Sequence, residues 1–333
     1  MKYIIGDIHT RKEEPFFGAA ESLFNHLKDK ILKKGDEIYQ VGDLFHYSKP
    51  SPKEYELVIS FLLWCEANNI KVSLMTGNHD FNVVQNTFSI DPLKEFCDIY
   101  NFPFMIKEFE RFDFVFLPWI STNTIKDMTK KNLSLKEFYS EWLPSQPDIV
   151  KKLSENKKTF LFYHFPDETI SFGGEFDGIS LKKYEELNPN IVRIGGDIHT
   201  QKENYIGTPY QTRYDEKGQT GRLYYIHDDG LLGQMDLPNF LEYKDIKFGE
   251  TSDYIENNRD QIILTISEAP SVSLAKESYE GYHIRKIDTL TNLERDVSTK
   301  VDSNSDIKKL LSDFLTINSV DKKTSKYLQE MLQ

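Results

Sequence analysis

Five short stretches of this chain each end an apolar run with aspartate, asparagine or histidine, which are side chains that bind divalent metal ions. The stretches are Gly6-Asp7-Ile8-His9, Gly42-Asp43-Leu44-Phe45-His46, Gly77-Asn78-His79-Asp80, Tyr163-His164 and Gly195-Gly196-Asp197-Ile198-His199. One such turn is usually an ordinary loop, but five in this order are typical of a site for two metal ions. Such a pair holds the attacking and the leaving oxygen of a phosphate ester. The pattern therefore predicts chemistry on phosphate esters.

The residue types suggest how two ions could be shared among these turns. A pair of ions about 3.5–4 Å apart needs a carboxylate that bridges both, and Asp43 suits that role. Asp7 and His9 alternate along an extended turn, so both side chains can face one ion. Asn78 offers a neutral amide oxygen to the other ion. Nitrogen and oxygen ligands without thiolate favour manganese, iron or zinc over magnesium or calcium.

His79 directly follows Asn78 and is therefore expected beside the ions, not bound to them. An imidazole in that place can give a proton to a leaving oxygen or stabilise charge on the phosphate. The next residue, Asp80, is expected to orient His79 by accepting a ring N–H.

Strand-like runs precede all five stretches, and helical patterns lie between them. The expected strands are 3–5, 37–41, 71–75, 112–117, 160–163, 191–194 and 223–226, and the expected helices are 16–32 and 51–67. Strands that alternate with helices predict an α/β fold built in layers. The ligands would gather at the carboxyl ends of the strands, where such folds place their sites.

The pattern changes near residue 236. Short alternating runs at 261–266 and 282–287 predict a small α+β domain over 237–290. Residues 291–304 are polar, as a linker would be. Apolar residues at helical spacing follow in 305–315 and 320–332, which predicts a helical pair within 305–333. The first domain would then cover 1–236.

Charge and composition restrict the surroundings of the site. A net charge of -12 argues against a broad basic surface, although a local basic strip at Arg11, Lys49 and Arg213 could contact phosphates. Cys65 and Cys97 lie in apolar, helix-like segments and are expected to be buried thiols. No signal peptide or membrane span is expected, so we expect a cytoplasmic location, the host cytoplasm if a phage encodes the chain.

Together these residues resemble the calcineurin-like metallophosphoesterases, whose motifs the five stretches match over residues 4–199. Within that superfamily the chain resembles the nuclease subunit of the SbcC–SbcD type, with the meiotic-recombination nuclease and the recombination endonuclease of tailed phages. That narrower resemblance rests on 42–51 and on Gly207-Thr208-Pro209-Tyr210-Gln211-Thr212-Arg213-Tyr214-Asp215-Glu216. It is strong over 1–230 and implies a layered β-sandwich flanked by helices, with 237–290 as a capping domain that borders a DNA cleft.

The resemblance also implies roles for particular residues. One ion would be held by Asp7, His9, Asp43 and His199, and the other by Asp43, Asn78, His164 and Asp197. His79 would be the catalytic histidine, and His46 would position the scissile phosphate. The family usually has Gly-His-x-His in its last motif, where this chain has Asp197 in place of the first histidine. Asp197 is expected either to bind through oxygen, which favours manganese or magnesium, or to act from beside the ligands.

The leading hypothesis is a two-metal DNA exo- or endonuclease that cuts phosphodiesters by attack of a metal-bound hydroxide. The resemblance implies a role in DNA repair and recombination, a coiled-coil ATPase of the SbcC type as partner and a homodimer whose interface involves 51–67 and 81–90. The helical pair in 305–333 would dock on the ATPase or pack on the chain's own second domain. The alternatives are a phosphomonoesterase or nucleotidase of the same fold, and a catalytically impaired adaptor of the ATPase.

Overall fold

The computed structural model describes residues 1–172 and 176–289, so the expected linker 291–304 and helical pair 305–333 lie outside the described residues. These residues form two compact units, which are described separately. The first holds Met1–Lys244, Thr251–Leu264 and Gly281–Arg285, and the second holds Asp245–Glu250, Thr265–Glu280 and the chain from Lys286 to Thr289.

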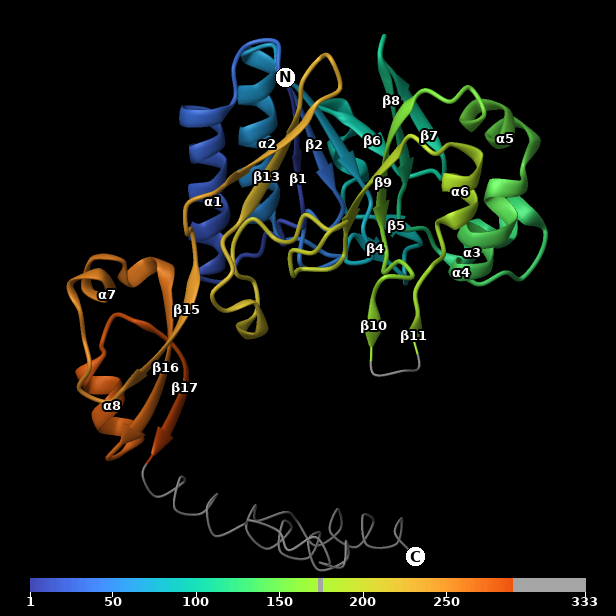
Figure 1. Ribbon diagram of the computed structural model, residues 1–333. Helices are drawn as coiled ribbons and strands as arrows, with labels where there is room; N and C mark the ends of the chain where they lie inside the picture. The colour runs from blue at the N-terminus through green and yellow to red at the C-terminus, as the bar shows by residue number, and fades with distance from the viewer. Residues whose placement is uncertain (173–175, 290–333) are drawn as a thin grey trace, which may run out of the picture. The chain divides into compact units, whose positions relative to one another are not determined.

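A six-stranded sheet carries the first three of the five turns (Figure 1). In spatial order its strands are β14 (Leu232–Asp236), β13 (Arg222–Ile226), β1 (Lys2–Ile5), β2 (Glu37–Val41), β3 (Lys71–Met75) and β6 (Asp98–Tyr100). From β1 to β6 neighbouring strands are parallel, whereas β13 and β14 pair antiparallel. The carboxyl ends of β1, β2 and β3 therefore meet at one edge.

A four-stranded sheet carries the last two turns. Its order is β12 (Ile191–Gly196), β9 (Lys158–His164), β8 (Phe112–Leu117) and β7 (Met105–Glu108). The strands β12, β9 and β8 are parallel, and β7 pairs antiparallel with β8. Two short hairpins follow turns of the site, namely β4 (Phe81–Asn82) with β5 (Thr87–Phe88), and β10 (Ser171–Phe172) with β11 (Phe176–Asp177).

The two sheets pack face to face through an aromatic core. On β8 the alternating residues Phe112, Phe114 and Phe116 face this core, as the two-residue period of a strand requires. Tyr39 of the first sheet packs edge-on against Phe114, with ring centroids 4.9 Å apart. The intervening β8 residue Val115 belongs to the core on the other side of the second sheet.

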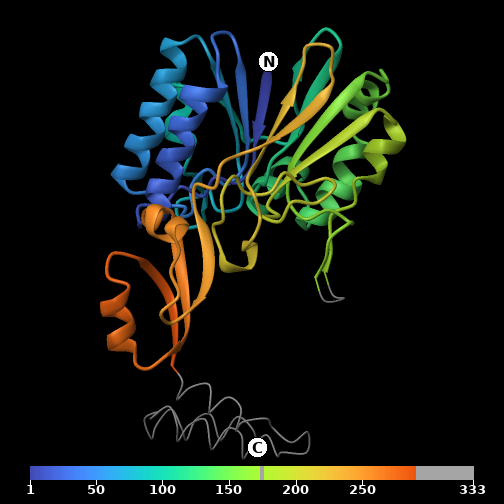
Figure 2. The ribbon, with the colours of Figure 1, turned by 60° about the vertical axis from the view of Figure 1, so that its left-hand side comes forward.

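Helices cover the outer faces of both sheets, which gives the layers helix, sheet, sheet and helix (Figures 1 and 2). The long helices α1 (Phe16–His26) and α2 (Pro52–Ala67) pack on the first sheet, where Phe24 and Phe61 stack at 4.6 Å. The short helices α3 (Thr122–Thr129), α4 (Leu135–Glu137), α5 (Pro147–Leu153) and α6 (Lys182–Leu187) lie on the side of the second sheet.

A three-stranded sheet follows, in the order β15 (Glu242–Lys247), β16 (Ile262–Ala269) and β17 (His283–Thr289). The helices α7 (Asp253–Asn257) and α8 (Val272–Ser278) lie between its strands in sequence. The expected α/β fold of packed sheets and flanking helices is confirmed, and so are the strands expected in 1–236. The domain boundary at 236 and the role of 237–290 as a capping domain stay predictions. No helix in the described part of the chain is both long and apolar enough to cross a membrane.

Candidate metal centre

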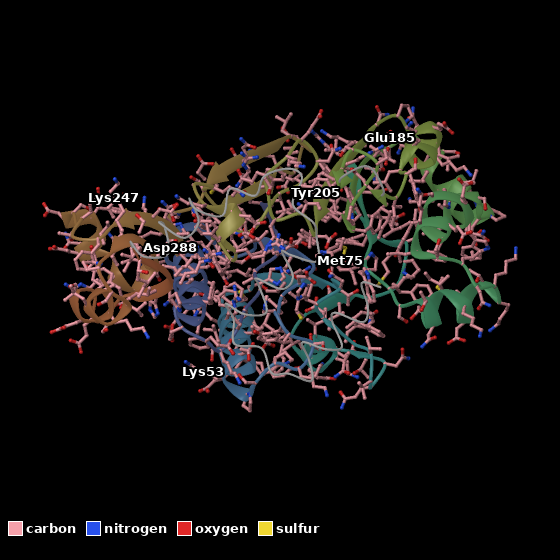
Figure 3. The ribbon with its side chains drawn as sticks, turned by 90° about the horizontal axis from the view of Figure 1, so that it is seen from below. Lys53, Met75, Glu185, Tyr205, Lys247 and Asp288 are labelled. Atoms are coloured by element: carbon pink, nitrogen blue, oxygen red, sulfur yellow. The ribbon has the colours of Figure 1, made fainter. Side chains whose placement is uncertain are left out.

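The five turns converge at the carboxyl ends of parallel strands, on the face that Figure 3 views from below. In this view Met75 and Tyr205 lie near the middle of the first unit, while Lys53 and Glu185 lie towards opposite edges. The turn residues Asp7, His9, Asp43 and His164 are almost fully buried within this unit. Polar side chains that are buried this deeply need partners or ions.

Backbone contacts fix the first two turns against each other. The N–H of His9 donates to the carbonyl of Asp43 at 2.9 Å, and the N–H of Thr10 donates to that of Leu44 at 2.9 Å. Three site residues adopt left-handed backbone conformations, with φ of 50° at His9, 53° at Asp43 and 72° at Asp197. Each costs about 1–3 kcal/mol and persists only where the surroundings impose it.

One group of ligand atoms surrounds the ring of His164. Its Nδ1 lies 2.8 Å from the carbonyl oxygen of Val41, which can only accept, so Nδ1 carries the proton. Its Nε2 then faces Asn78 Oδ1 at 3.1 Å and Asp43 Oδ2 at 3.3 Å. Burial lowers the pKa of His164, but the carboxylates of Asp43, Asp7 and Asp197 together outweigh burial and raise it well above its usual value. Positive charge is therefore stabilised where these atoms meet, and either a proton or a metal ion can provide it.

A second group of ligand atoms joins Asp7, His9 and His199, each with one atom within 4.8 Å of the others. The Nε2 atoms of His9 and His199 are 2.8 Å apart. Both carboxylate oxygens of Asp7 are buried without a hydrogen-bond partner, and burial raises its pKa to about 7. Buried carboxylate oxygens without hydrogen-bond partners, beside two imidazole rings, fit a divalent cation, because a cation is the partner they lack.

Asp43 lies between the two groups. Its Oδ2 is 3.7 Å from His9 Nε2 and 3.3 Å from His164 Nε2, and its Oδ1 accepts the N–H of His79 at 2.9 Å. Burial raises the pKa of Asp43, but His164, His9 and His79 together outweigh burial and lower it below its usual value. This position is the one that a bridging carboxylate requires.

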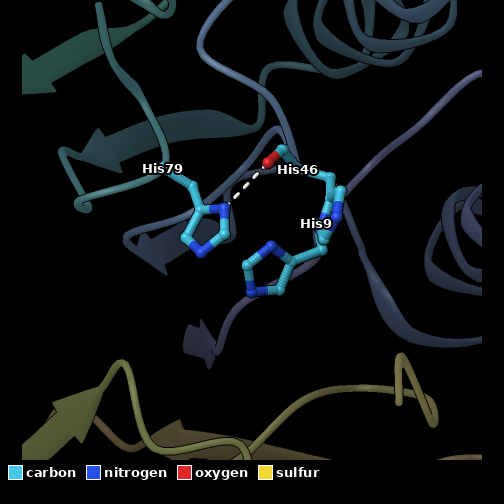
Figure 4. A group of neighbouring side chains, drawn as sticks. All are labelled: His9, His46 and His79. Atoms are coloured by element: carbon cyan, nitrogen blue, oxygen red, sulfur yellow. Dashed lines mark hydrogen bonds between the residues drawn. The ribbon is translucent and has the colours of Figure 1, made fainter. Parts of the chain in front are cut away.

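His46 and His79 lie beside His9 (Figure 4). The ring of His9 is 4.8 Å from that of His79 and 5.3 Å from that of His46. Nδ1 of His79 lies 2.7 Å from the backbone carbonyl oxygen of His46. The expectation that Asp80 orients His79 is therefore wrong. The buried carboxylate of Asp80 instead accepts the backbone N–H groups of Asp43 at 3.1 Å and Gly77 at 2.9 Å.

Among the described residues, Asp197 and the expected basic strip make no hydrogen bond to the side chains of the two groups. Asp197 is half-buried at the end of β12, and burial raises its pKa although His164 opposes this. Arg11 donates through Nη2 to the carbonyl of Thr212 at 2.7 Å. Lys49 is exposed. Arg213 is also exposed, and its Nε points to the Glu216 carboxylate at 3.3 Å.

No sequence pattern assigned a role to Glu216, which the structure places against His199. Its Oε1 accepts from His199 Nδ1 at 2.6 Å, and its side chain is almost fully buried. The available signal was its position at the end of 207–216. The same stretch reaches the first turn, because the hydroxyl of Tyr210 donates to the carbonyl of Ile8 at 2.5 Å.

Comparison with known families agrees with this arrangement. Residues 3–202 match the Calcineurin-like phosphoesterase family. This chain belongs to that family. As a calcineurin-like phosphoesterase it is a metal-dependent hydrolase of phosphoesters, and its clustered histidine and aspartate side chains could hold the metal.

Solved structures resemble it only distantly. A protein of unknown function from Aquifex aeolicus is 19% identical over 56% of this chain and 93% of its own, with a TM-score of 0.28. A Staphylococcus aureus protein provisionally assigned as a 5′-nucleotidase, in complex with alpha-ketoglutarate, is 12% identical over 71% of this chain and 52% of its own, with a TM-score of 0.38. At these TM-scores neither likeness bears on activity. No protein with a curated description matches this chain.

Proposed function

We propose that this phosphoesterase is a two-metal DNA nuclease, the nuclease subunit of an SbcC–SbcD-like complex for DNA repair and recombination. Its ligands would be Asp7, His9, Asp43 and His199 for one ion, and Asp43, Asn78, His164 and Asp197 for the other. Manganese is the preferred ion and magnesium the second choice, because oxygen ligands outnumber imidazoles around the second position. Arg11, Lys49 and Arg213 would contact the DNA backbone.

One observation carries the choice of a nuclease. The two stretches on which the resemblance to the SbcD type rests, 42–51 and 207–216, both contact the candidate metal centre. From the first, the carbonyl of His46 accepts from the ring of His79. From the second, Thr212 and Glu216 both contact Nδ1 of His199, at 3.1 and 2.6 Å.

The side chains around the ions can be given separate tasks. When bound, a divalent pair would supply Lewis acidity, which neutralises phosphate charge and lowers the pKa of water so that hydroxide is available at neutral pH. His79 holds its Nδ1 proton against the His46 carbonyl, so Nε2 is the nitrogen that exchanges a proton with the substrate, and it donates to the leaving oxygen when the ring is doubly protonated. The ring of His46 lies 5.4 Å from that of His79 and can contact the phosphate from the same side.

The proposed partners are DNA, an SbcC-like coiled-coil ATPase and a second copy of this chain. A subunit with a net charge of -12 holds DNA weakly alone, which fits a protein whose partner supplies much of the grip. The contact with the ATPase is proposed for 305–333, outside the described residues.

Purified full-length protein tests the proposal when it is incubated with Mn²⁺ and either labelled duplex DNA or nucleoside monophosphates. We expect DNA cleavage that is lost in Asp43→Ala, with Lys151→Ala on the exposed surface of helix α5 as a control. Cleavage that Asp43→Ala leaves intact would contradict the mechanism. Phosphate release from monophosphates without DNA cleavage would favour the nucleotidase. A lack of activity with any metal, together with tight binding to the ATPase, would favour the adaptor.

A further inference from the structure

The carboxylate of Glu216 is held unusually firmly for a residue that the proposed reaction does not use. Its Oε2 accepts the backbone N–H of Thr212 at 2.6 Å and the hydroxyl of Thr208 at 3.2 Å. Its Oε1 accepts the hydroxyl of Thr212 at 3.0 Å and the ring of His199 at 2.6 Å. With an exposed fraction of 1%, the side chain has no freedom to turn away from the ring.

This arrangement selects one protonation pattern for His199. A carboxylate can only accept, so the ring nitrogen beside it must carry the proton. Nδ1 is therefore the protonated nitrogen of a neutral His199, and Nε2 keeps its lone pair. That Nε2 lies 2.8 Å from His9 Nε2, within the group of ligand atoms that includes Asp7.

We infer that Glu216 is a positioning residue, which orients the His199 ring and directs its Nε2 lone pair to a divalent cation. A carboxylate behind a metal-binding imidazole fixes the ring and makes it a stronger ligand. The inference deepens the proposed function and rests on it, because it assumes that His199 binds an ion.

The substitution Glu216→Gln separates positioning from support of the loop. The N–H of Thr212 at 2.6 Å requires an acceptor at the Oε2 position, so the amide oxygen of the glutamine is expected there. The NH₂ group of the glutamine would then face the N–H at Nδ1 of His199, so that two hydrogen-bond donors would lie against each other. The ring must rotate or move its proton to Nε2, and either change removes the lone pair from the ion.

Titration of the metal-free, full-length protein with Mn²⁺, followed by the electron paramagnetic resonance of free Mn²⁺, measures the effect. In Glu216→Gln we expect one of two sites to bind about 10–100-fold more weakly, which is typical for loss of such a carboxylate. Asp215→Asn is the matched control, because it removes the same charge from a neighbouring side chain that is 73% exposed. It should bind Mn²⁺ as the wild type does.

Thr208→Val tests the role of the loop itself, because it removes a hydrogen bond to Oε2 and leaves the carboxylate beside His199. We expect it to lower the unfolding temperature without changing Mn²⁺ affinity. Equal loss of affinity in Thr208→Val and Glu216→Gln would overturn the inference, and so would wild-type affinity at both sites in folded Glu216→Gln.

Should Glu216→Gln fail to fold, nuclear magnetic resonance of the zinc-loaded wild type decides. The ring proton of His199, assigned by its loss in His199→Gln, is expected on Nδ1, and a proton on Nε2 would overturn the inference. None of these measurements uses DNA. Protein that binds Mn²⁺ as expected but leaves DNA intact would therefore remove the nuclease proposal and not this one.

Discussion

Nδ1 of His79 lies 2.7 Å from the backbone carbonyl oxygen of His46, and this contact determines which nitrogen of His79 can act on a substrate. A carbonyl only accepts, so Nδ1 keeps its proton and Nε2 is the nitrogen available for proton transfer. The contact also joins the turn after β3 to the turn after β2, so both turns must be in place for the ring to be oriented.

Replacement of His79 by asparagine should lower turnover and leave metal binding intact. Loss of a general acid costs about 10²–10⁴-fold in rate. The kcat for DNA cleavage should fall by that range, whereas the Mn²⁺ affinity measured without substrate stays at the wild-type value. A large loss of Mn²⁺ affinity would instead show that His79 is a metal ligand. This outcome is worth testing, because His79 forms a group with His9 and His46 that could itself hold an ion.

Replacement of His46 by alanine should have a smaller effect. The carbonyl that holds His79 belongs to the backbone and remains in the variant, so the orientation of His79 is kept. The lost imidazole would contact the phosphate, so we expect KM for DNA to rise more than kcat falls. A fall in kcat as large as that of the His79 variant, with KM unchanged, would show that the His46 ring takes part in the chemical step.

Replacement of Gly77 by alanine should weaken metal binding through a steric effect alone. A Cβ atom at Gly77 would lie 2.0 Å from Oδ1 of Asp43, so the carboxylate would have to move. We expect weaker Mn²⁺ binding and a loss of about 1–3 kcal/mol in the free energy of unfolding.

Gly18→Ala is the matched control for Gly77→Ala. In helix α1 its Cβ would meet only the end of the Glu14 side chain, at 3.2 Å. Alanine is favoured over glycine inside a helix by about 1 kcal/mol, so this variant should be at least as stable as the wild type and should bind Mn²⁺ normally. Normal Mn²⁺ binding in Gly77→Ala would mean that Asp43 is not held where the structure places it.

The strands and the turns of the site follow from local patterns, and for that reason they could be predicted. For example, the strand-like run 37–41 predicts a strand, and Gly42 and Asp43, which follow it directly, predict where that strand ends. Glu216 and Asp80 could not be assigned in this way, because His199, which Glu216 contacts, is 17 residues away in sequence, and Asp43, which Asp80 contacts, is 37 residues away. Which acceptor reaches the ring of His79 likewise depends on how two turns pack, and no single segment encodes that.

Between pH 6.5 and about 8 the metal-free protein should lose stability as the pH rises. The pKa of His164 is raised well above 6.5, so the folded protein retains a proton that the unfolded chain releases in this range. Asp7, with its pKa raised to about 7, acts in the same direction up to that pH. The lowered pKa values of His9 and His46 oppose this only below 6.5.

Thermal unfolding in a chelator across this pH range measures the effect, and Mn²⁺ should reverse it. The cation replaces the protons and binds more tightly as its ligands lose them, so the unfolding temperature with Mn²⁺ should rise with pH. Stability that increases from pH 6.5 to 8 without metal would contradict the assignment of the His164 proton.

Asp197 is where this chain departs from the family's usual histidine, and its substitution by asparagine tests whether the carboxylate binds an ion. The residue has φ of 72°, a conformation that asparagine and histidine tolerate better than most residues, so Asp197→Asn should fold normally. If the carboxylate is a ligand, one Mn²⁺ site should weaken by about tenfold or more, which is about 1.4 kcal/mol.

Asp197→His should recover binding but shift the preference from Mn²⁺ towards Zn²⁺, because an imidazole replaces an oxygen ligand. Competition between Mn²⁺ and Zn²⁺ in both variants measures this shift. If both variants keep the wild-type affinities, the second ion would be held by Asp43, Asn78 and His164 without Asp197.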